Sequence, residues 1–142
     1  MLLLVAGAKV VSQCYSSTTY SFLSLYCGNE HVIRIERALH GIHSNARIVH
    51  CGRIQGDCAM NTLRHYDWRS CEGQRACVLS IKPLEVIRCS NDTHEWLNES
   101  EAGNGKPEVG QEMSTSGHQQ YLQVHYTCVH GNQHDDRFHI HN

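Results

Sequence analysis

The stretch Tyr121-Leu122-Gln123-Val124-His125-Tyr126-Thr127-Cys128 carries the clearest structural signal in the sequence. Apolar and polar side chains alternate along it, and those on one side are Leu122, Val124, Tyr126 and Cys128. A period of two residues places successive side chains on opposite faces of an extended chain. The stretch therefore predicts a β-strand with one face in a hydrophobic core.

Three shorter stretches upstream give weaker strand signals. They cover residues 31–37, where Ile33 and Ile35 share a face, residues 47–51 and residues 77–81. Each is bounded by polar residues or glycine, which are typical of turns. These stretches predict three further short strands.

One short helix is expected within residues 60–71. Asn61 or Thr62 is a suitable N-terminal cap, and Leu63 and Trp68 would be the buried contacts. Strands combined with one helix favour an α+β fold. We expect a compact, disulfide-rich, sandwich-like domain of antiparallel strands with one short helix and long loops.

Eight cysteines spread from Cys14 to Cys128 restrict the class of protein further. The gaps between them hold 12, 23, 6, 12, 5, 11 and 38 residues, so no C-x2-C pair typical of structural zinc exists. Disulfides are therefore favoured over a metal site, which indicates an oxidising, extracellular setting. The residues alone leave the pairing open among on the order of a hundred possibilities.

The remaining composition argues for a binding module rather than an enzyme. A net charge of −2 gives no electrostatic reason to expect nucleic acid or an anionic membrane as a partner. No apolar stretch reaches the roughly 20 residues of a membrane span. The sequence has no G-x-S-x-G, H-E-x-x-H or phosphate-loop motif. We therefore expect no catalytic residue and no cofactor.

The chain divides into a central domain at residues 14–129 and two flanking segments. Residues 1–13 are interpreted as a truncated leader or an ordered first strand, and residues 130–142 as a polar, histidine-rich tail without a specific metal site. Residues 90–119 are interpreted as a long surface loop inserted in the domain. This loop contains two N-x-S/T glycosylation acceptors, Asn91 and Asn98.

Three sequence blocks add a family likeness. The first comprises Cys27-Gly28-Asn29, Val32-Ile33-Arg34-Ile35 and Ala38-Leu39-His40-Gly41. The second is Cys71-Glu72-Gly73-Gln74-Arg75-Ala76-Cys77-Val78, and the third is the strand stretch with Gln120 before it. Together with the order of the eight cysteines, these blocks resemble the rhamnose-binding lectin domain of sea urchin egg lectin.

This resemblance implies both a disulfide pairing and a function. The implied pairs are Cys14–Cys51, Cys27–Cys128, Cys58–Cys89 and Cys71–Cys77. The implied function is metal-independent carbohydrate binding by an extracellular module with a role in cell adhesion, so cell-surface glycans are the expected partners. The alternative is a protein-interaction module of an adhesion or guidance receptor that has lost sugar binding and takes a glycoprotein or receptor partner.

The resemblance also points to candidate sugar-binding residues, several of which differ from the family pattern. Tyr15 stands where the family has an acid, Ile42 where it has Arg, and Ile87 with Arg88 where it has Asp-Pro. Gly41 is kept and is expected to allow a turn with positive φ. The candidates for carbohydrate binding are His40, Gly41, Arg88, Gln120 and Tyr121. His40 replaces a family Tyr and Gln120 a family Lys, so the expected sugar specificity stays open.

Overall fold

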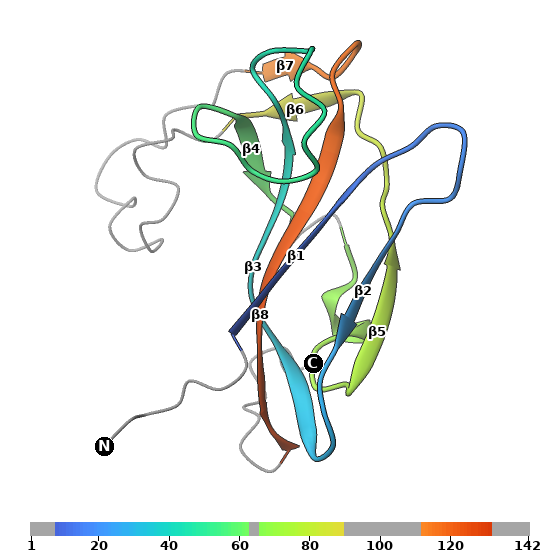
Figure 1. Cartoon of the computed structure of the whole chain (residues 1–142), viewed down its shortest axis with the longest axis vertical. Coiled ribbons are helices and arrows are strands. Elements are labelled where there is room, and N and C mark those ends of the chain that lie inside the picture. The colour runs from blue at the N-terminus through green and yellow to red at the C-terminus, as the bar shows by residue number, and fades with distance from the viewer. Residues whose placement is uncertain (1–7, 63–65, 90–111, 132–142) are drawn as a thin grey trace, which may run out of the picture.

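The computed structural model describes residues 8–62, 66–89 and 112–131, and nearly all its regular structure is β-strand (Figure 1). The strands are β1 (Ala8–Cys14), β2 (Phe22–Tyr26), β3 (His31–Ile42), β4 (Cys58–Asn61), β5 (Ala76–Ser80), β6 (Val86–Arg88), β7 (Glu112–Ser114) and β8 (Gln120–His130). One turn of 3-10 helix, η1 (Trp68–Ser70), completes the described elements.

The strand predicted at residues 121–128 is confirmed as the centre of the fold. It forms most of β8, which pairs antiparallel with β1 on one side and with β3 on the other, in the sheet order β1-β8-β3-β4. Two small antiparallel sheets, β2-β5 and β6-β7, complete the topology. A register shift in β3 between Ile35 and Arg37 marks a bulge opposite β8.

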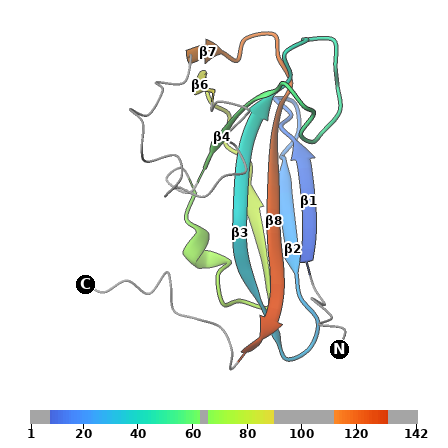
Figure 2. The same cartoon turned by 90° about the vertical axis from the view of Figure 1, so that its left-hand side faces the viewer.

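The core lies between the four-stranded sheet and the β2-β5 pair, which Figure 2 shows behind that sheet. The apolar face of β8 contributes Leu122, Val124 and Tyr126, all at most 3% exposed, as the alternation predicts. Trp68 packs in the same cluster and its indole N–H donates to the carbonyl of Thr62. A smaller cluster of Ile42, Cys58 and Ile87 joins β3, β4 and β6.

The helix expected within residues 60–71 is wrong in the part of the chain that the structure describes. Met60 and Asn61 instead form the end of strand β4, whose backbone pairs with β3 from Cys58 onward. Only Trp68–Ser70 are helical, and Asp67 caps this turn through the N–H of Arg69. Residues 63–65 lie outside the described residues. The described residues therefore form a β-rich, disulfide-bonded domain, without the helix of an α+β fold among them.

Residues 47–51 are not a strand, which is a second correction. They belong to the long connection between β3 and β4, where Asn45 accepts hydrogen bonds from the N–H groups of Arg47 and Ile48. Val49 is 75% exposed, so the apolar pair Ile48-Val49 did not mark a half-buried strand. A turn at Asn45 and the disulfide of Cys51 hold this connection instead of sheet pairing.

The segments at the ends of the domain and the expected insertion are described only in part. Residues 8–13 belong to β1, and within the loop expected at residues 90–119 residues 112–114 form β7. Strand β7 pairs with β6, so the described end of that loop is anchored in a sheet. Residues 1–7, residues 90–111 with Asn91 and Asn98, and residues 132–142 of the tail lie outside the described residues.

Four disulfides join the elements and leave no free cysteine. They are Cys14–Cys51, Cys27–Cys128, Cys58–Cys89 and Cys71–Cys77, the same pairs that the resemblance implies. Cys27–Cys128 ties the segment after β2 to the central strand across 101 residues, whereas Cys71–Cys77 closes a loop of only 6. Within the described ranges, no helix is long and apolar enough to cross a lipid bilayer.

Candidate functional site

Two of the five residues expected to bind sugar meet inside the protein. His40 of β3 is completely buried, and its Nε2 lies 2.8 Å from Oε1 of Gln120 in β8. The same oxygen accepts from the N–H of Leu84, and the Gln120 amide donates to the Leu84 carbonyl at 3.0 Å. The side chains of Gln120 and His40 therefore link β3, β8 and the segment before β6, and their polar atoms form hydrogen bonds inside the protein.

Two further candidates, Gly41 and Tyr121, face each other across the sheet. They are register partners in β3 and β8, and a Cβ at Gly41 would overlap the Tyr121 ring. Gly41 does not have a positive φ, so the turn expected there is wrong. Its lack of a side chain instead leaves room for a fully buried tyrosine.

Tyr121 belongs to a buried polar cluster that sequence reasoning missed. Its hydroxyl donates to Asp57 Oδ2 at 2.7 Å, and Asp57 lies 2.9 Å from Nδ1 of His43. The other ring nitrogen of His43 lies 2.5 Å from the carbonyl oxygen of His50. Asp57 also accepts from the N–H of Ile54, so it fastens the connection between β3 and β4 onto the sheet. Asp57 and His43 lie in irregular stretches of the sequence, with no periodic pattern to mark them.

The fifth candidate lies apart from the other four. Arg88 is exposed on β6 and forms an ion pair of 2.9 Å with Glu112 of β7, its register partner. This cross-strand pair fits the small β6-β7 sheet and involves none of the other four candidates. The structure thus brings four of the five candidates into the interior and leaves Arg88 on a separate sheet.

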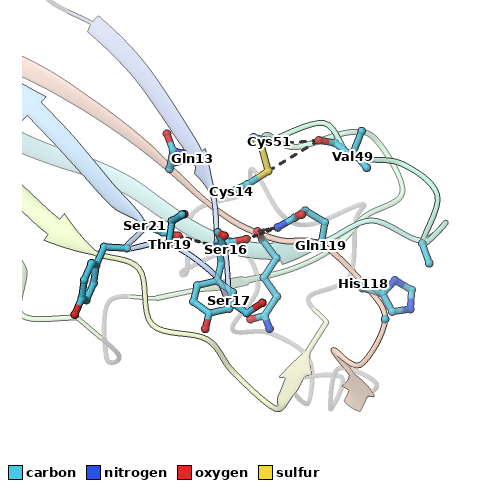
Figure 3. A pocket seen from close by; sticks show the side chains of 15 residues that line it. Gln13, Cys14, Ser16, Ser17, Thr19, Ser21, Val49, Cys51, His118 and Gln119 are labelled. Carbon is cyan, nitrogen blue, oxygen red and sulfur yellow. Dashed lines mark hydrogen bonds between the residues drawn. A yellow bond between two sulfur atoms is a disulfide. The ribbon is translucent and has the colours of Figure 1, made fainter.

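An open cavity of about 600 Å³ lies where the end of β1 meets the start of β8 (Figure 3). The segment after β1 forms one wall, the segment before β8 the second, and the Cys14–Cys51 disulfide the third. Its lining includes Tyr15 and Gln120, the two positions at which the family resemblance expects an acid and a lysine. The remaining lining residues are Gln13, Ser16, Ser17, Thr19, Tyr20, Ser21, Ala46, Val49, Gly117, His118 and Gln119.

Hydrogen bonds fix the wall formed by residues 15–21. Ser21 Oγ accepts from the N–H of Ser16 at 2.7 Å, which closes the segment on itself. The backbone of Tyr15 donates to the Gln120 carbonyl and its own carbonyl accepts from the Gln119 amide. The N–H of Ile81 donates to the Ser21 carbonyl. The segment is therefore held in one shape before any ligand arrives.

The described lining of this cavity is polar. Among the described residues no Asp, Glu, Lys or Arg lines it, and His118 is its one imidazole. The hydroxyls of Ser17 and Thr19 make no hydrogen bond to any described residue. Two tyrosines, Tyr15 and Tyr20, also line the cavity. Such a lining suits a neutral ligand with both hydroxyl groups and an apolar face. The hydroxyl-rich run Ser16-Ser17-Thr18-Thr19-Tyr20-Ser21 is the sequence feature that marks this wall.

Comparison of the chain with protein-family models, with curated proteins and with solved structures found no match.

Proposed function

We propose that this chain is a metal-independent glycan-binding module of an extracellular protein, and that the cavity at residues 15–21 and 117–120 is its sugar site. The observation that carries the proposal is the neutral lining of hydroxyls, amides and tyrosine rings around an open cavity. Sugar hydroxyls need donors and acceptors of this kind, and the C–H face of a sugar ring packs against an aromatic ring.

The family resemblance supports the same place from a different direction. Tyr15 and Gln120 stand at two positions that the resemblance aligns with sugar ligands of the family. They lie 105 residues apart in the sequence and line the same cavity. Neither carries a charge here, so these two positions offer no charge-assisted hydrogen bond and a modest affinity is expected. A weak single site fits a module that gains strength through multivalency at a cell surface.

The extracellular setting rests on the four disulfides. Disulfides persist in oxidising compartments and are rare in the cytosol. All eight cysteines are paired, which leaves no thiol for metal binding or for nucleophilic chemistry. A binding role outside the cell is the function that agrees with both the bridges and the uncharged cavity.

The test is a glycan-array screen of the oxidised protein, followed by titration of the bound sugar into two variants. Ser17→Ala removes a hydroxyl of the cavity lining that has no hydrogen-bond partner among the described residues, and we expect it to weaken binding about fivefold to tenfold. Ser70→Ala, at an exposed serine of η1, is the matched control and is expected to bind as the parent does. Free galactose and rhamnose as competitors report whether the family's sugars are accepted.

Two results would contradict the proposal. A folded protein that binds no glycan on the array favours the protein-interaction module instead. Binding that survives unchanged in Ser17→Ala and in Thr19→Val moves the sugar away from this cavity.

A further inference from the structure

We infer that the ligand is an extended oligosaccharide, of which one sugar occupies the cavity and the following sugars lie along an aromatic ledge on β2 and β5. This inference rests on the proposed function and specifies its ligand class. The ledge consists of the exposed side chains of Tyr20, Phe22, Tyr26 and Val78.

The ledge begins at the cavity itself. Tyr20 lines the cavity and also a second, adjoining hollow of about 380 Å³ that reaches Ser80 and Ile81. Its ring stacks on the ring of Phe22 with a centroid distance of 6.0 Å and an interplanar angle of 27°. Tyr20 is 89% exposed and Phe22 50%. The rings of Tyr20 and Phe22 therefore form one continuous surface that leads from the cavity to the outer face of β2.

The period of β2 explains why these rings point outward. Leu23 and Leu25 are buried in the core, so Phe22, Ser24 and Tyr26 must project from the opposite face. Phe22 and Tyr26 are four residues apart, which is about 13 Å along an extended strand. The ledge is thus longer than a single sugar ring.

The partner strand completes a face of alternating rings and hydroxyls. On β5, Ser80 lies opposite Phe22, Val78 opposite Ser24 and Ala76 opposite Tyr26. None of the six outward side chains of this pair is charged. Apolar rings with serine hydroxyls beside them match the two surfaces of a neutral sugar, its C–H face and its hydroxyl edge.

The ledge is also rigid. Behind it, Leu23, Leu25 and Leu79 pack in the main core, and the Cys71–Cys77 disulfide ties the start of β5 to η1. A ligand that lies on a prearranged surface loses less free energy to ordering of the protein. Large exposed aromatic side chains on such a surface are uncommon unless they contact a partner.

The experiment compares two probe lengths with three variants. The probes are free galactose and a linear galactose tetrasaccharide, with rhamnose and its tetrasaccharide as a second pair, titrated by calorimetry. We expect the parent protein to bind one tetrasaccharide about tenfold more tightly than its monosaccharide. Tyr26→Ser is expected to remove that gain and leave monosaccharide affinity unchanged, because Tyr26 lies outside both hollows.

The matched control is Val10→Ser, since Val10 of β1 is 58% exposed and Tyr26 55%. This variant is expected to keep the tetrasaccharide gain. Ser17→Ala, in contrast, is expected to weaken both probes because it removes a group of the cavity itself. These three patterns separate the ledge from the cavity and from a general effect of removing surface apolar area.

Three outcomes would overturn the inference. Equal affinity for monosaccharide and tetrasaccharide in the parent, with Tyr26→Ser without effect, overturns the ledge and leaves the proposed function standing. No binding of any probe by folded protein overturns both together. A parent that is dimeric in light scattering and becomes monomeric on Tyr26→Ser shows that a second copy covers this face.

Discussion

The cavity at residues 15–21 and the buried cluster around Asp57 are both polar regions at the same end of the four-stranded sheet, and they differ in what their polar atoms do. In the cluster, Asp57 accepts from Tyr121, from Ile54 and from His43. In the cavity, Ser17 and Thr19 have no partner among the described residues. Satisfied buried polar groups fix a fold, whereas exposed, prearranged and unsatisfied groups are suited to a ligand.

This contrast explains why the positions that the resemblance aligns with sugar ligands divide into buried residues and residues that line the cavity. His40 and Tyr121 are fully buried, and Tyr121 holds the β3–β4 connection in place through Asp57. Gln120 lines the cavity while its side-chain amide binds Leu84. Residues that the resemblance aligns with sugar ligands therefore serve as structural support in this protein, and the ligand-facing role is proposed for the neighbouring hydroxyls.

The largest expected effect comes from removing the centre of the buried cluster. Asp57→Ala leaves His43, Tyr121 and the Ile54 N–H without their shared acceptor in the interior. We expect the free energy of unfolding to fall by about 4 kcal/mol, the range for breaking a buried pair by removing one partner. Urea denaturation followed by fluorescence measures it.

The control for this change is Asp67→Ala. Asp67 pairs with Arg69 on the surface and caps η1, with both side chains largely exposed, so this variant should lose much less stability than Asp57→Ala. Equal midpoints for the two aspartate variants would show that the buried cluster does not hold the fold, and the contrast with the cavity would then fail.

A second, smaller effect is expected at Gly41. In Gly41→Ala the new methyl group would overlap the ring of Tyr121, and both residues lie in paired strands that cannot separate easily. We expect a loss of about 2 kcal/mol from overpacking, measured by the same denaturation. Gly28→Ala is the matched control because nothing lies within 4 Å of its added carbon. A similar urea midpoint for both variants would mean that the packing beside Tyr121 rearranges with little loss of stability.

The sequence predicted the strands whose faces differ in polarity and missed the features that depend on tertiary contacts. The alternation at residues 121–128 identified the central strand because its buried face contacts one core. Of the helix expected within residues 60–71, the described residues keep only the turn Trp68–Ser70, and Met60 and Asn61 pair with β3 instead. The strand at residues 47–51 failed because two neighbouring apolar residues show no period.

The candidate site was predictable only in part for a similar reason. Tyr15 and Gln120 were aligned to ligand positions by resemblance, and the structure places both on one cavity. The role of Asp57 could not be predicted, because its partners come from three separate segments of the chain. A surface hydroxyl such as that of Ser17 looks the same in sequence whether or not it lines a hollow.

The smallest expected effect concerns His125, which is neither fully buried nor open to solvent. Burial lowers the pKa of His125 below its ordinary value near 6.5, and the nearby charges of Arg37 and Arg53 lower it further. The amide of Gln123 lies 3.0 Å from His125 Nε2, and its oxygen already accepts from the Arg53 N–H. The amide therefore presents an N–H to the ring, which suits a neutral histidine.

A histidine whose pKa is depressed in the folded state contributes stability above its unfolded pKa, and this contribution is lost as the pH falls through the folded pKa. Between pH 7 and pH 5 the unfolded chain takes up the proton more readily, so the free energy of unfolding should decrease. In His125→Gln this part of the decrease should disappear, and denaturation at several pH values measures the difference between variant and parent. Parallel pH profiles of stability for the two proteins would show that His125 gains a proton in the folded protein as readily as a histidine in solvent does. The polar groups on this face of β8 would then resemble the solvent-accessible groups of the cavity rather than the buried groups around Asp57.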